Sequence, residues 1–149
     1  MNRITLSGNI MWIEDESDVR EFVSLVLTSH GATVQSFATG QEALEDYRPE
    51  SVDVVLTDFQ MPTMTGAEGI SRIRETDPHT PVILVTGLRD LESLVSSFDH
   101  ELFAILPKPF NAVQLIDTVK RGIRHKRQVQ TLVNGKEGTS PSQIIGSHG

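Results

Sequence analysis

The 149-residue chain contains no cysteine, which excludes disulfide bonds and any metal site built on thiolates. A chain without cysteine suits a reducing compartment, and we expect a cytoplasmic protein. No apolar run is long enough to cross a bilayer, and the first eight residues are too short and polar for a secretory signal, so we expect no membrane partner. The length is typical of one domain with a single core.

Basic residues are scarce over most of the chain. Residues 1–119 contain 7 Lys and Arg against 19 Asp and Glu, whereas residues 120–149 contain 6 against 1. An acidic body repels phosphate backbones, so we expect no direct binding of nucleic acid by this domain. The short basic segment is expected to complement the negative end of a helix.

Glycine-rich phosphate-binding loops are also absent, because neither Gly-x-Gly-x-x-Gly nor a P-loop follows any apolar run. The chain instead contains five short apolar runs, each followed by a segment with helical signals. Strands are predicted at residues 10–13, 32–37, 52–58, 81–85 and 103–106, and helices at 17–30, 39–48, 67–75, 89–98 and 111–127, with Ser17, Thr39 and Asn111 as N-caps. Five such units predict an α/β fold with a parallel sheet covered on both faces.

Polar side chains follow four of the predicted strands: Glu14 and Asp15, then Asp58, Thr86 and Lys108. Parallel strands present their carboxyl ends at one edge of a sheet, so three carboxylates, a hydroxyl and an ammonium group are expected to converge there. Carboxylates this close raise one another's pKa unless a cation neutralises them. Mg²⁺ suits the set, because it takes carboxylate oxygens, keeps water ligands and accepts a phosphate oxygen.

This set of groups predicts phosphoryl transfer. With Mg²⁺ bound, Asp58 can attack phosphorus as a nucleophile and form an aspartyl-phosphate. Lys108 and the Thr86 hydroxyl would then hold two phosphoryl oxygens as charge redistributes. Taken singly, each residue also fits a structural role: Asp58 as a turn former, Thr86 as a cap and Lys108 as a surface lysine.

Four motifs occur in order at these strand ends. They are Ile13-Glu14-Asp15-Glu16, Leu56-Thr57-Asp58-Phe59-Gln60-Met61-Pro62 with Gly66 beyond it, Val85-Thr86-Gly87, and Leu106-Pro107-Lys108-Pro109-Phe110. Together they resemble the receiver (CheY-like) domain of bacterial two-component response regulators. The resemblance spans roughly residues 9–126, and we expect a receiver domain at 9–127 and a flexible tail or linker at 128–149.

The resemblance implies a flavodoxin-like, doubly wound fold with five parallel strands in the order 2-1-3-4-5. It implies that Asp58 accepts a phosphoryl group from a phosphohistidine of a histidine kinase, or from a small phosphodonor. Mg²⁺ would be bound by Glu14, Asp15, Asp58 and the backbone carbonyl of Gln60. The resemblance further implies a cis peptide bond between Lys108 and Pro109.

Signalling, on the same resemblance, passes through the face formed by the fourth helix, the fifth strand and the fifth helix. That face would control a downstream protein or a tethered output domain, and a homodimer through it is a further expectation. Onward transfer to a histidine phosphotransfer protein is an alternative. The domain would catalyse nothing beyond its own phosphorylation and dephosphorylation.

One departure from the family pattern concerns the switch. Receivers usually carry Tyr or Phe three residues before the lysine, where this chain has Ile105, and the nearest aromatic residue is Phe103. Phosphorylation could still draw Thr86 inward, but a phospho-independent interaction module remains an alternative. A phosphohydrolase of the haloacid dehalogenase type would need an aspartate where Gln60 stands, which argues against it.

The segment from Gln128 onward carries little information. Residues 134–142 are rich in Gly and Ser and are typical of a linker. Three interpretations stay open: a free tail, a linker to an output domain outside this chain, or a docking segment. Residues 144–147 faintly resemble the opening of the ATPase domain of enhancer-binding response regulators, which favours the linker.

Overall fold

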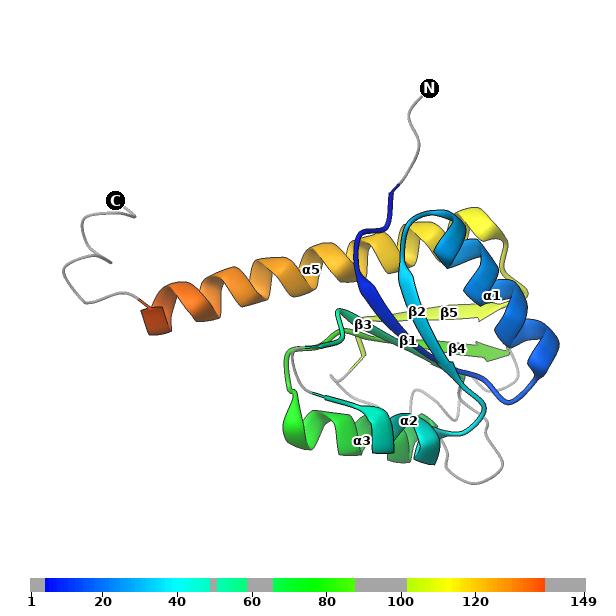
Figure 1. Ribbon diagram of the computed structural model, residues 1–149, viewed down its shortest axis with the longest axis horizontal. Coiled ribbons are helices and arrows are strands. Elements are labelled where there is room, and N and C mark those ends of the chain that lie inside the picture. Colours follow the sequence, from blue (N-terminus) through cyan, green and yellow to red (C-terminus); the bar gives the residue numbers. More distant parts are fainter. Residues whose placement is uncertain (1–4, 49–50, 59–65, 88–101, 139–149) are drawn as a thin grey trace.

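The computed structural model describes residues 5–48, 51–58, 66–87 and 102–138. Its centre is a sheet of five parallel strands in the order β2-β1-β3-β4-β5 (Figure 1). The strands are β1 (Asn9–Ile13), β2 (Thr33–Phe37), β3 (Val54–Asp58), β4 (Val82–Gly87) and β5 (Ala104–Lys108). This is the flavodoxin-like order that was expected, so the predicted fold class is confirmed.

Helices cover both faces of the sheet (Figure 1). They are α1 (Ser17–Ser29), α2 (Gly40–Asp46), α3 (Gly66–Thr76) and α5 (Ala112–Gly138). Helices α1 and α5 share one apolar cluster with the sheet, and α2 and α3 share another on the opposite face. The helix predicted at residues 89–98 lies outside the described residues.

The central position of β3 in the sheet explains why its sequence is a continuous apolar run. Every residue from Val54 to Asp58 is buried. Val54 and Leu56 belong to the cluster beneath α1 and α5, whereas Val55 belongs to the cluster beneath α2 and α3. A strand covered on both faces needs apolar side chains at successive positions, and this burial fixes β3 and its terminal aspartate in the middle of the sheet.

Two of the three predicted N-caps are present. Thr39 Oγ1 accepts a hydrogen bond from Glu42 N (3.1 Å), and Asn111 Oδ1 accepts one from Gln114 N (2.8 Å). The prediction for Ser17 is wrong, because Ser17 is the first helical residue and Glu16 occupies the cap position without a side-chain capping bond.

The start of α1 is fixed instead by contacts with the end of β1. Glu16 N donates to Glu14 Oε2 (3.1 Å), and Arg20 Nη1 donates to the Glu14 carbonyl (2.7 Å). The first turn of α1 is thereby tied to the residue that follows the strand.

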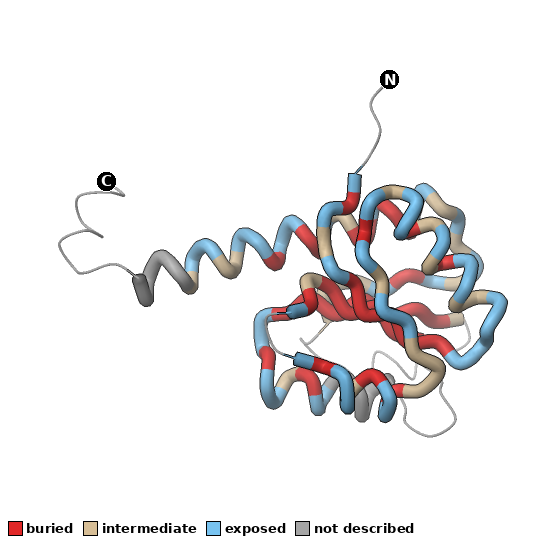
Figure 2. The backbone as a smooth tube through the Cα atoms, viewed as in Figure 1, coloured by how far each residue is buried: buried red, intermediate tan, exposed pale blue. Residues whose placement is uncertain are grey.

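The last helix is longer than predicted. The sequence predicts a flexible segment from Gln128, but α5 continues to Gly138 and projects away from the sheet (Figures 1 and 2). Residues 128–133 contain neither Gly nor Pro, so nothing interrupts the helical hydrogen bonds there. Among the described residues, no helix combines the length and apolarity that a membrane span needs.

Candidate functional site

Strand register brings the predicted site residues to one edge of the sheet. In the described pairs Asp58 lies opposite Val85, Thr86 opposite Pro107, and Gly87 opposite Lys108. Glu14 directly follows β1, which pairs with β3. The carboxyl ends of four strands therefore deliver their polar residues to the same place, as the sequence predicts.

Three carboxylates converge at this edge. One oxygen each from Glu14, Asp15 and Asp58 lies within 4.8 Å of the other two. Glu14 is fully buried and Asp58 is 7% exposed, whereas Asp15 is exposed. The cluster is thus closed on the protein side and open to solvent at Asp15.

The burial of Glu14 has an electrostatic consequence. Desolvation and the neighbouring charge of Asp58 raise the pKa of Glu14 to about 7, although a hydrogen bond from Glu16 N and the charge of Lys108 act in the opposite direction. Its Oε1 atom is buried and receives no hydrogen bond. Its neighbour is the Lys108 ammonium group at 3.5 Å, and a divalent cation would satisfy this oxygen as a ligand.

Lys108 supplies a positive charge to the cluster. Its Nζ lies 3.0 Å from Asp58 Oδ1 and 3.5 Å from Glu14 Oε1. Burial would lower the pKa of the ammonium group, but the hydrogen bond to Asp58 and the charges of both carboxylates outweigh it and raise the pKa. The Lys108–Pro109 peptide bond is cis, as the resemblance implied.

Thr86 reaches the same edge from β4. It is 1% exposed, and its hydroxyl donates to the Gly87 carbonyl over 3.3 Å. Gln60, predicted to offer a carbonyl to the metal, lies outside the described residues. The described part of the predicted set therefore comes together: three carboxylates, one ammonium group and one buried hydroxyl.

Arg20 is one residue that the sequence did not single out. Its guanidinium bonds to the Glu14 carbonyl, and its own carbonyl accepts a hydrogen bond from Trp12 Nε1 (3.1 Å). It connects the first turn of α1 to the strand end that carries the acidic pair. Its position one turn into a helix that follows the acidic pair was the available signal.

Comparison with known families agrees with this geometry. Residues 10–120 match the family model of the response regulator receiver domain. The chain belongs to this family. It is a receiver domain of the kind found in two-component response regulators, and its fold and strand order are those of such receivers.

Relatives of this receiver include multidomain regulators. The chain is 33% identical over 142 residues to the DNA-binding transcriptional regulator NtrC of Klebsiella pneumoniae, covering 95% of this chain and 30% of that protein. It is 32% identical over 126 residues to the C4-dicarboxylate transport transcriptional regulatory protein DctD of Rhizobium meliloti (strain 1021), covering 85% and 27%. The chain thus spans about 30% of the length of the first of these curated relatives.

A solved receiver is similar in both sequence and structure. The receiver domain protein of Clostridium thermocellum is 29% identical, with a TM-score of 0.75, and the match covers 82% of this chain and 98% of that one. The likeness therefore extends over an entire receiver domain.

The sequence predicts that Ile105 occupies the switch position of this receiver. Ile105 lies in β5 and is 37% exposed. Phe103 lies just before the strand, packs against the cluster beneath α1 and α5, and places its ring centroid 5.1 Å from that of His125. The Phe103 ring is thus held against α5.

Proposed function

We propose that this receiver takes up a phosphoryl group on Asp58 in a Mg²⁺-dependent reaction and passes the signal on by protein contact. The observation that supports this most directly is the convergence of Glu14, Asp15 and Asp58 within 4.8 Å, with Lys108 Nζ 3.0 Å from Asp58. Phosphoryl transfer to a carboxylate nucleophile requires carboxylates, a cation site and a fixed ammonium group.

The proposed metal ligands are Glu14, Asp15, Asp58 and the backbone carbonyl of Gln60. The buried Oε1 atom of Glu14, which accepts no hydrogen bond, and the all-oxygen donor set fit a hard divalent cation. Bound there, Mg²⁺ would neutralise the carboxylates and the charge on the phosphoryl oxygens. The chain's own contribution is to hold Glu14, Asp15 and Asp58 at the carboxyl ends of the paired strands β1 and β3.

Asp58 is the proposed nucleophile. A carboxylate oxygen forms the bond to phosphorus while the bond from phosphorus to the imidazole nitrogen of the donor breaks, and the imidazole leaves with a proton. Lys108, already in contact with the Asp58 carboxylate, would bind one phosphoryl oxygen. The Thr86 hydroxyl would exchange its bond to the Gly87 carbonyl for a second phosphoryl oxygen.

The proposed donor is a histidine kinase or a histidine phosphotransfer protein. Because NtrC and DctD are named as transcriptional regulators and are more than three times as long, we place a tethered output domain after α5. The receiver would occupy residues 9–127, and the continuation of α5 would lead to that domain. Signal would pass through the face that includes β5 and α5.

A second candidate follows from Ile105. The usual aromatic readout is missing at that position, so this receiver could bind its partner whether or not Asp58 is phosphorylated. The two functions differ in one measurement: partner affinity changes on phosphorylation in the first and stays constant in the second.

The chemistry can be tested by intact-mass spectrometry after incubation with acetyl phosphate. We expect a mass gain of one phosphoryl group that requires Mg²⁺, disappears with EDTA and is absent in Asp58→Asn. Asp53→Asn is the matched control, because Asp53 precedes the same strand at its other end and bonds to Asn9 N. Labelling of Asp58→Asn at the wild-type rate would remove Asp58 from its proposed role.

A further inference from the structure

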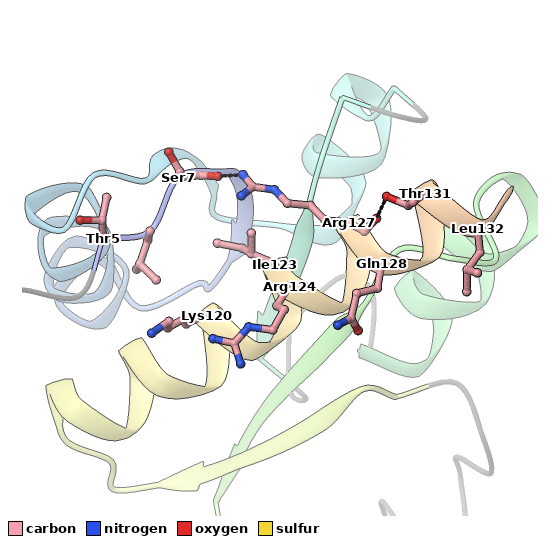
Figure 3. Close-up of a pocket in the computed structure, with 10 residues that line it drawn as sticks. Thr5, Ser7, Lys120, Ile123, Arg124, Arg127, Gln128, Thr131 and Leu132 are labelled. Atoms are coloured by element: carbon pink, nitrogen blue, oxygen red, sulfur yellow. Dashed lines mark hydrogen bonds between the residues drawn. The ribbon is translucent and has the colours of Figure 1, made fainter. Parts of the chain in front are cut away.

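A groove of about 670 Å³ lies between the segment that leads into β1 and the helix α5 (Figure 3). It is at the edge of the sheet opposite the acidic cluster, because Leu6 and Ser7 precede the amino end of β1. On the α5 side the lining extends from Lys120 to Leu132. The helical rise from the first to the last of these thirteen residues is about 18 Å, or a little over three turns.

The groove combines positive charge with apolar surface. Lys120, Arg124 and Arg127 line it from one side of α5, at spacings of four and three residues. Within the described part of the chain, none of the ion pairs involves these three side chains. Leu6 and Ile123 line the groove beside them, and Leu132 at its end is 70% exposed.

Arg127 connects the two sides of the groove. Its guanidinium donates to the Ser7 carbonyl, which ties the N-terminal segment to α5 (Figure 3). Lys120 and Arg124 remain for a ligand, because neither forms an ion pair with an acidic side chain among the described residues. A partner with carboxylates and apolar side chains would suit the groove.

The chain itself carries such a surface on α1. Phe22 is 48% exposed and Leu25 is 66% exposed, three residues apart on the outer side of the helix. Asp18 and Glu21 are exposed on the same side, one turn earlier. This acidic, apolar face is the complement of the groove in both charge and hydrophobicity.

We propose that two copies of this chain associate, with the outer face of α1 in each copy docked in the α5 groove of the other. Helices α1 and α5 contact each other and pack over the same face of the sheet, so the two surfaces belong to neighbouring helices. A two-fold axis can therefore pair each α1 with the opposite groove and close the assembly at two subunits. This inference goes beyond the proposed function and does not involve Asp58.

The chemistry of the contact sets the kind of dimer to expect. Two exposed apolar side chains and two carboxylates per copy make a small interface, so the affinity is modest. The charges lie on solvent-exposed surfaces, so added salt weakens the association. The net charge of −7 makes copies of the chain repel one another, which favours a dimer over larger assemblies.

The experiment is sedimentation equilibrium of the 149-residue chain over a range of protein concentrations at low and high salt. We expect the mass at low salt to rise with concentration from 16.5 kDa toward twice that value, and the rise to weaken at high salt. Arg124→Glu and Glu21→Lys should each raise the dimer dissociation constant about tenfold or more. An equimolar mixture of the two variants should regain the association, because both contacts then pair opposite charges.

Two controls separate this interface from others. Arg121→Glu reverses a charge on α5 outside the groove, at an exposed side chain that pairs with Asp117, and should leave the mass unchanged. Val113→Glu places a charge on the exposed first turn of α5, near the β5–α5 face, and should also leave it unchanged. A monomer at every concentration, an equal effect of Arg121→Glu, loss of the dimer in Val113→Glu, or failure of the mixture to associate would each overturn the proposal.

Discussion

Lys126 Nζ lies 3.7 Å from Asp77 Oδ2, and their side chains are 3% and 9% exposed. Tyr47 and Thr80 donate to the same carboxylate oxygen over 2.7 and 2.6 Å, and Lys126 also donates to the Val52 carbonyl over 3.3 Å. This buried network connects α5 to α2, to the turn after α3 and to the segment before β3. It fixes α5 near the point where the helix leaves the domain.

Replacing Lys126 should therefore be costly. Lys126→Met keeps most of the side-chain volume but leaves the Asp77 carboxylate buried without its cation, and we expect the free energy of unfolding to fall by about 3 kcal/mol. Urea unfolding at neutral pH measures the loss. The control is Arg121→Met, which breaks an exposed pair with Asp117 and should cost less than about 1 kcal/mol. Equal losses in the two variants would show that the network does not anchor α5.

The same network predicts a pH dependence. Burial would raise the pKa of Asp77, but hydrogen bonds from Thr80 and Tyr47 and the charge of Lys126 outweigh it and lower the pKa below 3.8. A carboxyl pKa that is lower in the folded protein contributes stability above the unfolded pKa, and this contribution is lost as the pH falls through the folded value. The destabilisation caused by Asp77→Asn should be constant from about pH 7 to 5 and shrink below about pH 4.

Urea unfolding of both proteins at several pH values tests this. Asp117→Asn alters an exposed carboxylate that bonds to Arg121, and it should change stability little throughout. A destabilisation by Asp77→Asn that grows on acidification would contradict the assignment.

Much of the site could be predicted because parallel strands end together. One apolar run stops at Asp58, and another continues into Glu14. Both carboxylates must therefore lie at one edge of the sheet, whatever the details of side-chain packing. Lys108 follows by the same reasoning. The distances of 3.0 and 3.5 Å from Lys108 to its two partners, and the missing hydrogen bond at Glu14 Oε1, depend on side-chain packing and could not be read from the chain.

The Lys126 network shows where sequence patterns are insufficient. The sequence pattern predicts that Lys126 is one of several cations near the negative end of a helix. Nothing in the local sequence distinguishes it from Arg124 or Arg127. Its burial depends on Asp77, which is far away in the chain. The length of α5 was missed for a related reason: Gly135 and the Ser and Pro residues beyond it suggest a linker, but the uninterrupted segment before them continues the helix.

Glu14 should reduce the stability of the metal-free protein. Its pKa of about 7 means that above this pH the carboxylate is ionised against burial and the charge of Asp58, which costs stability relative to the unfolded chain. We expect Glu14→Gln to increase the free energy of unfolding by about 2 kcal/mol at pH 8 in EDTA. It should also remove most of the stabilisation that Mg²⁺ gives to the wild type.

Asp15→Asn is the matched control for this comparison. Asp15 belongs to the same cluster but is exposed, so in EDTA its replacement should change stability little, while the response to Mg²⁺ still weakens. Thermal unfolding with EDTA and with millimolar Mg²⁺ measures both effects. If Glu14→Gln destabilises the metal-free protein, the carboxylate is not under the strain that its burial implies.

Lys108 and a bound cation should partly replace one another. In the metal-free protein Lys108 neutralises Asp58 and Glu14 at 3.0 and 3.5 Å, so Lys108→Met leaves two neighbouring carboxylates without a cation and should lower the free energy of unfolding by about 2 kcal/mol in EDTA. Mg²⁺ supplies the missing charge, so the variant should gain more stability from Mg²⁺ than the wild type does. Thermal unfolding across a Mg²⁺ titration compares the two gains, with Arg121→Met as a variant that should match the wild type. A smaller gain in Lys108→Met would mean that the lysine supports metal binding rather than standing in for the metal.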